Sequence, residues 1–98
     1  SMAVLCLAQS NPAAKAARDW RTGKEAQILR EYIDLLSIPN VASDRDNIRK
    51  NAELIKSMLE KRGVAARLLE APGANPAVYG EILKPGAQRT VVFYAHYD

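Results

Sequence analysis

The stretch TVVFYAHYD (residues 90–98) combines the most strand-like pattern of the sequence with its most chemically suggestive side chains. Residues 90–95 are β-branched, aromatic or small, without a charged interruption, which is typical of a strand buried on both faces. Such a strand needs neighbouring strands and covering helices. The stretch therefore predicts a layered α/β fold, and the upstream sequence offers elements that would complete it.

Two further strands are predicted immediately upstream. Residues 64–70 hold apolar residues without helical signals, and residues 77–83 form a second apolar run with polar interruptions. The loop PGANP (residues 72–76) separates these two runs and is rich in turn-forming residues. The connection KPGAQR (residues 84–89) is short enough to join neighbouring antiparallel strands.

Two helices are predicted before the strands. The first begins near Thr22, which has capping-box spacing to Glu25, and it ends before Pro39. The second begins after the hydroxyl cap of Ser43, with acidic residues in its first turn, and it ends at Gly63 in a left-handed cap. Apolar residues recur at helical spacing along both, so each is expected to cover the sheet.

These elements predict an α/β domain with two N-terminal helices followed by three strands of a mixed sheet. It spans residues 22–98, and residues 1–21 form a tail and linker. The 98 residues are 48% hydrophobic and 26% charged, which excludes a disordered or collagenous chain. The net charge of +3 is spread along the chain and predicts no nucleic-acid partner. No apolar run approaches the roughly 20 residues of a membrane span.

The tail contains a short apolar run, AVLCLA (residues 3–8), followed by small residues. This resembles the end of a secretory signal, although no basic segment precedes it. Two localisations stay open: export, for instance to a bacterial periplasm, and the cytoplasm. The single cysteine, Cys6, excludes an intramolecular disulfide.

The chemistry of the sequence centres on His96 and Asp98. Side chains two apart on an extended strand point to the same face, so the imidazole and the carboxylate can lie together at the carboxyl end of the strand. A zinc-bound histidine usually donates its other N–H to a carboxylate or carbonyl. We therefore expect His96 to be a metal ligand and Asp98 to act beside it, either on His96 itself or on a neighbouring ligand.

The order of these segments resembles the N-terminal part of the two-zinc amidohydrolase and peptidase family. The segments that carry the resemblance are LSIPN (residues 36–40), the predicted helix ending MLEKRG (residues 58–63), PAVYGEI (residues 76–82) and VVFYAHYD (residues 91–98). The family includes aminoacylases, dipeptidases, glutamate carboxypeptidases, acetylornithine deacetylase and succinyl-diaminopimelate desuccinylase. The resemblance covers about residues 25–98.

The resemblance implies that His96 is the first zinc ligand and that Asp98 is the catalytic aspartate two residues later. It also implies a parent hydrolase with two zinc ions, acting on small peptides or N-acyl amino acids. The other ligands and the glutamate general base would lie beyond Asp98. The chain is therefore expected to be an N-terminal fragment that is inactive alone, with an incomplete metal site or none.

Two alternatives stay open. A second zinc-aminopeptidase family also places His-x-Asp after an apolar strand. The chain could instead be a small binding module without enzymatic activity, in which HYD (residues 96–98) is incidental. Because an apolar strand such as residues 90–95 is unsuited to an exposed edge, both the fragment and the module are expected to self-associate through an exposed sheet edge.

Overall fold

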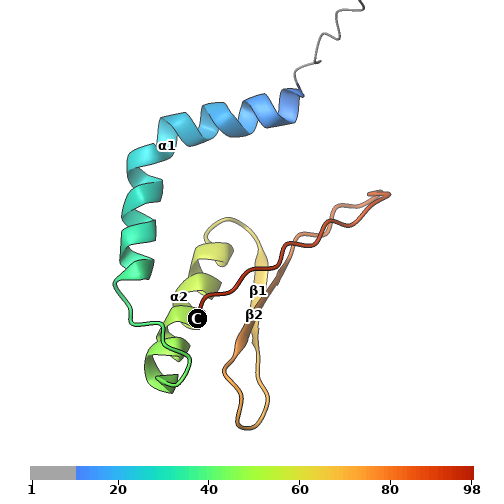
Figure 1. The fold of residues 1–98 in the computed structure, drawn as a ribbon. Helices are drawn as coiled ribbons and strands as arrows, with labels where there is room; N and C mark the ends of the chain where they lie inside the picture. Colours follow the sequence, from blue (N-terminus) through green and yellow to red (C-terminus); the bar gives the residue numbers. More distant parts are fainter. Residues whose placement is uncertain (1–10) are drawn as a thin grey trace, which may run out of the picture. The chain divides into compact units, whose positions relative to one another are not determined.

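The computed structural model describes residues 11–98. Its elements follow in the order α1 (Pro12–Leu36), α2 (Arg45–Glu60), β1 (Ala65–Leu69) and β2 (Ala77–Glu81), as Figure 1 shows. The chain divides into two units, with the boundary between Tyr32 and Ile33. The predicted mixture of helices and a sheet is confirmed. The signal-like run of residues 3–8 lies outside the described residues.

Helix α1 begins at Pro12, well before the start predicted near Thr22. The Asn11 side chain caps it, since its Oδ1 accepts a hydrogen bond from the backbone N–H of Ala13 at 2.9 Å. Proline is favoured at the first helical position because its missing N–H would have no partner there. The Thr22 hydroxyl instead donates to the carbonyl of Arg18 at 3.0 Å, so the predicted capping box is not formed.

The C-terminal turn of α1 was predicted to present an apolar face to a sheet. The helix ends at Leu36, shortly before Pro39, as the proline position predicts. Ile33 and Leu36 nevertheless remain 63% and 58% exposed. Helical periodicity therefore predicted the helix, although within residues 11–98 these two apolar side chains stay exposed.

Helix α2 begins and ends at side chains suited to its termini. The Asp44 carboxylate, rather than the predicted Ser43 hydroxyl, accepts from the backbone N–H of Asn47 at 3.2 Å. A carboxylate also interacts favourably with the positive end of the helix dipole, which a hydroxyl cannot do. At the other end Gly63 adopts φ +77°, as the left-handed cap requires, and its N–H donates to the carbonyl of Glu60 at 3.0 Å.

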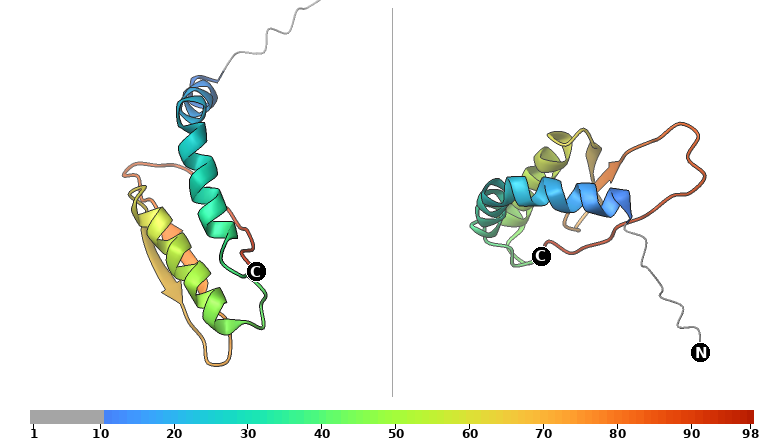
Figure 2. Two further views of the ribbon diagram at one scale, coloured as in Figure 1. Left: turned by 90° about the vertical axis from the view of Figure 1, so that its left-hand side faces the viewer. Right: turned by 90° about the horizontal axis from the view of Figure 1, so that it is seen from above.

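Strands β1 and β2 form a two-stranded antiparallel hairpin, with Ala65 opposite Glu81 and Leu69 opposite Ala77. Helix α2 lies against one face of this hairpin (Figure 2). Ile48 and Ala52 of α2 are completely buried. This small core packs α2 against the hairpin, so α2, β1 and β2 form a two-layer unit of one helix on one sheet.

Gly80 of β2 leaves room for the side chains of Val64 and Leu59. A Cβ at this position would lie 2.9 Å from Cγ1 of Val64 and 3.3 Å from Cδ1 of Leu59. Any larger residue would therefore push the end of α2 and the start of β1 away from β2.

The third predicted strand is not formed. Residues 90–95 belong to no strand, and the sheet within residues 11–98 has antiparallel pairing alone rather than the predicted mixed pairing. After β2 the chain runs out beyond the hairpin and returns toward α2 (Figures 1 and 2). Val92 and Phe93 are 82% and 92% exposed. β-Propensity expresses how well a side chain fits a packed sheet surface, and here that surface is missing.

Candidate functional site

His96 lies between Asp98 and Tyr94, and each of its ring nitrogens has a polar partner. Nδ1 of His96 is 3.1 Å from Oδ1 of Asp98. Nε2 of His96 is 3.0 Å from the hydroxyl of Tyr94, and the two rings meet edge to face with centroids 5.4 Å apart. The alternation that the sequence predicted thus brings the imidazole and the carboxylate together.

The carboxylate of Asp98 determines which ring nitrogen carries the proton when the imidazole of His96 is neutral. An ionised carboxylate can only accept hydrogen bonds, so Nδ1 of His96 is the donor in this pair. Nε2 then has a free lone pair, which accepts from the Tyr94 hydroxyl. This is the tautomer in which Nε2 is ready to bind a metal ion.

The pair is open to solvent. The His96 side chain is 71% exposed and that of Asp98 is 37% exposed. The sequence predicted a position at the rim of a sheet, at the carboxyl end of a strand. In the structure the pair instead follows a segment that pairs with neither β1 nor β2.

Tyr97 ties the end of the chain to the hairpin. Its hydroxyl donates a hydrogen bond to the carbonyl oxygen of Pro76, the residue immediately before β2. Burial raises the pKa of the Tyr97 phenol, and the negative charge of Asp98 raises it further. The hydroxyl therefore stays protonated as a donor, although the nearby Arg49 partly opposes the shift.

Arg49 of α2 is a second charged group that acts on Tyr97, after Asp98. Its guanidinium donates to the carboxylate of Glu70, just after β1, and it also lies 4.0 Å from Glu53 one turn along α2. The hydrogen bond and charge of Glu70 raise the pKa of Arg49. The groups are exposed, so this ion pair links α2 to the end of β1 without dominating stability.

The donor set fits one ligand position of a metal site. Within residues 11–98, no group of three or more histidine, cysteine, aspartate or glutamate side chains is placed to hold a metal ion. A catalytic zinc takes three protein ligands. Nε2 of His96 could supply one of them, while Nδ1 is bonded to Asp98.

Two tyrosines of this site were missed at the sequence level. Tyr94 shares the period-two face of His96 and Asp98, so the alternation that paired those residues would also have placed Tyr94 beside them. Tyr97 lies on the opposite face, where the sequence predicted a packed strand. No local signal points to its acceptor, a carbonyl 21 positions away in the chain.

Comparisons of the chain with models of protein families, with curated proteins and with solved structures give no match. Neither α1 nor α2 combines the length and the apolar character that crossing a membrane requires.

Proposed function

We propose that this chain is the N-terminal portion of a zinc-dependent hydrolase that cleaves peptide or amide bonds of small peptides or N-acyl amino acids. Small peptides are the preferred substrates, because YAHYD (residues 94–98) resembles the dipeptidase branch of the family more than the deacetylase branch. His96 is the first zinc ligand and Asp98 its orienting carboxylate. The chain alone is inactive, since one ligand does not make a catalytic centre.

The observation that carries this proposal is the bond between Nδ1 of His96 and the carboxylate of Asp98 at 3.1 Å. Carboxylate–histidine pairs of this kind raise the basicity of the metal-bound nitrogen and fix the orientation of the ring. The exposure of His96 leaves Nε2 accessible once the Tyr94 hydroxyl turns aside. A histidine packed among hydrocarbon side chains would have opposed the proposal.

Zinc, when bound in such a centre, lowers the pKa of a water molecule and polarises the scissile carbonyl. The contribution of this chain is narrower. Asp98 holds the Nδ1 proton of His96, so Nε2 keeps its lone pair for the metal. The remaining ligands and the general base come from residues that follow Asp98 in the proposed parent.

The proposal also accounts for the exposed segment of residues 90–95. In the parent, further strands and helices would pair with it and cover it, and it would become the third, buried strand of a mixed sheet. His96 would then lie at the carboxyl end of that strand, where open α/β sheets collect their ligands.

The direct test is to express the complete reading frame that encodes this chain and assay it with dipeptides and N-acyl amino acids. We expect hydrolysis that a chelator abolishes and zinc restores. Replacing His96→Ala should abolish turnover. Asp98→Asn should lower zinc affinity or activity about 10- to 100-fold, as loss of an orienting partner does.

The matched control is Tyr79→Phe, which removes an exposed hydroxyl bonded to Glu81 on the hairpin, away from His96. It should leave turnover unchanged. A reading frame that ends at Asp98, or a His96→Ala enzyme with full activity, would overturn the proposal.

The exposed apolar residues favour a second candidate, a self-associating binding module without enzymatic activity. Val91, Val92, Phe93 and Tyr94 are all more than 70% exposed, and the two-stranded hairpin has two open edges. In this reading a second copy pairs with the segment by edge-to-edge contact or strand exchange.

Light scattering combined with thermal unfolding separates the two candidates. The module predicts a defined oligomer of the 98-residue chain that unfolds cooperatively and dissociates when Phe93→Lys places a charge on the segment. The fragment predicts association that grows with concentration without a defined size, together with broad unfolding.

A further inference from the structure

We propose that Tyr97 is a positioning residue: its hydroxyl, bonded to the Pro76 carbonyl, fixes where His96 and Asp98 lie relative to α2 and the hairpin. The consequence for zinc binding rests on the proposed function. The anchoring itself does not, because it concerns contacts within this chain.

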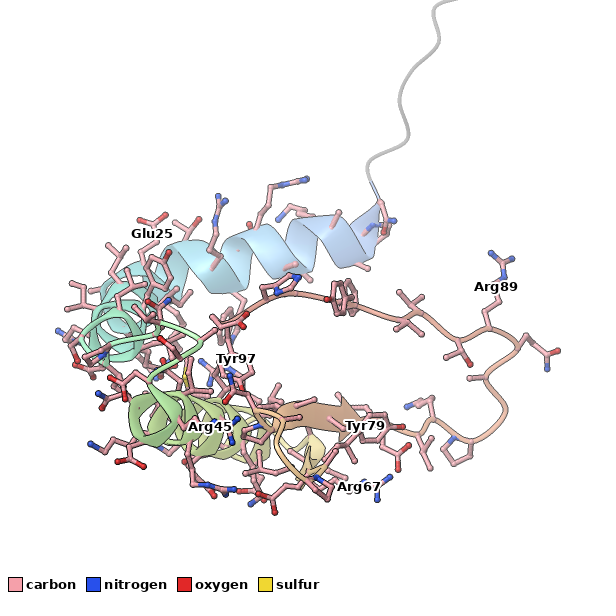
Figure 3. The ribbon with its side chains drawn as sticks, turned by 60° about the horizontal axis from the view of Figure 1, so that its bottom comes forward. Glu25, Arg45, Arg67, Tyr79, Arg89 and Tyr97 are labelled. Atoms are coloured by element: carbon pink, nitrogen blue, oxygen red, sulfur yellow. The ribbon has the colours of Figure 1, made fainter. Side chains whose placement is uncertain are left out.

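Tyr97 differs in burial from the residues that precede it. Every residue of positions 82–96 is exposed, whereas Tyr97 is partly buried. In Figure 3 the labelled Tyr97 lies near α2, while Arg89 projects from the far end of the loop between β2 and the C-terminus. Tyr97 is thus the place where the returning segment meets the packed part of the molecule.

Side chains alternate along the end of the chain. His96 and Asp98 bond to each other, and Tyr97 between them bonds to Pro76. In extended chain, successive side chains point to opposite sides. One side of the chain end therefore carries the metal-binding pair, and the other side carries the anchor.

The acceptor of the Tyr97 bond, the carbonyl of Pro76, is held in place. Pro76 is buried, and its ring restricts the backbone. The preceding Asn75 donates from Nδ2 to the carbonyl of Ala42 at 2.8 Å, and Arg45 donates to the carbonyl of Gly73 at 2.8 Å. These two bonds tie the loop before β2 to the turn before α2.

A fixed acceptor makes the anchor effective. If the loop were loose, the Tyr97 hydroxyl would add a contact without defining a position. Because the loop is tied at Gly73 and at Asn75, the bond to Pro76 places Tyr97 and both of its neighbours in one frame with α2. Correct placement of a ligand within a fraction of an ångström is what a metal centre requires.

The test is Tyr97→Phe in the 98-residue chain, followed by NMR. Heteronuclear ¹H–¹⁵N NOE values at residues 96 and 98 report ps–ns order of the chain end. We expect wild-type values close to those of β2 and, in Tyr97→Phe, a fall to the values of a free terminus. Tyr79→Phe is the matched control, since it removes an exposed hydroxyl that donates to Glu81 of the same strand, and should change neither residue.

A zinc titration of the same samples keeps the two proposals separate. Zinc chloride should shift the ring signals of His96 in both the wild type and Tyr97→Phe, because Nε2 stays available. Equal NOE values in the two chains overturn the anchoring role of Tyr97, whatever zinc does. A fall in NOE confirms the anchor whether or not His96 responds to zinc, and turnover by the enzyme encoded by the complete reading frame decides the proposed function separately.

A further experiment distinguishes a role of Tyr97 in the metal site from a purely structural role. In the enzyme encoded by the complete reading frame, Tyr97→Phe should lower zinc affinity about tenfold, within the range found for outer-shell partners of metal ligands. The melting temperature of the zinc-free protein should remain within a few degrees of the wild type. A large drop in melting temperature with unchanged zinc affinity would assign Tyr97 to stability alone.

Discussion

Helix α2 and the C-terminal segment (residues 82–98) both carry large apolar side chains, yet they differ completely in burial. Ile48 of α2 is 0% exposed, whereas Phe93 of the segment is 92% exposed. The difference lies in their partners. The hairpin packs against α2, and neither of its strands pairs with residues 90–95. An apolar sequence pattern thus leads to a buried helix or strand only where a complementary surface packs against it.

The sharpest way to test this comparison is to make the same substitution in both regions. Ile48→Ala removes a completely buried side chain and should destabilise the α2–hairpin unit by about 2–5 kcal/mol. Ile82→Ala removes an identical side chain that is 71% exposed and should change stability by less than about 0.5 kcal/mol. Urea unfolding followed by circular dichroism measures both. Equal effects would mean that the segment is packed in solution.

A smaller effect is expected at the end of α2. Gly63→Ala should destabilise the unit by about 1–2 kcal/mol, because alanine is strained at φ +77°. No atom lies within 4 Å of the added Cβ, so backbone strain is the cause. Gly23→Ala provides the contrast. It lies inside α1 with open space around it and should raise helix content, since alanine favours helices by about 1 kcal/mol. Helix loss in both variants would contradict this reading.

The smallest effect concerns pH and the cap of α2. Hydrogen bonds from the Asn47 side chain and backbone lower the pKa of Asp44 below its ordinary 3.8. A lowered folded-state pKa means that this stabilisation is complete above the unfolded value and is lost as pH falls below 3.8 through the folded pKa. Asp44→Asn keeps a cap acceptor but does not titrate.

The measurement for Asp44 is the midpoint of urea unfolding as a function of pH. Below pH 3.8 the wild type should lose stability more steeply than Asp44→Asn, and the two curves should run parallel above pH 5. If the curves of the wild type and Asp44→Asn are parallel at every pH, the charge of Asp44 does not stabilise the start of α2.

Local signals predicted the part of the fold whose contacts are close in sequence. The turn-forming loop of residues 72–76 predicted the break between the two strands, and Gly63 predicted the end of α2, because backbone geometry at these points depends on the residues themselves. The antiparallel junction was instead predicted at residues 84–89, and the structure forms it across residues 70–76. The start of α1 was predicted too late, since Thr22 offered a capping pattern that the longer helix, capped at Asn11, overrides. The third strand could not form from propensity alone, because a strand needs a neighbour to pair with.

In the candidate site, too, sequence predicted the contact between near neighbours but not the contact between distant residues. His96 and Asp98 are two residues apart, and period-two alternation predicted that they would lie together. The anchor of Tyr97 on Pro76 depends on the return of the chain after a long loop, which no local pattern encodes. Sequence therefore predicted the His96–Asp98 pair, and the structure adds the hydrogen bond from Tyr97 to Pro76.

The most direct test of the central claim is the ¹⁵N spectrum of the His96 ring in the 98-residue chain, recorded at alkaline pH with and without zinc. The chain has a single histidine, so the signals need no assignment among several rings. We predict a protonated Nδ1, held by Asp98, and an unprotonated Nε2 whose signal shifts when zinc is added. In Asp98→Asn the preference for this tautomer should weaken. A protonated Nε2 in the wild type would contradict this assignment of the tautomer.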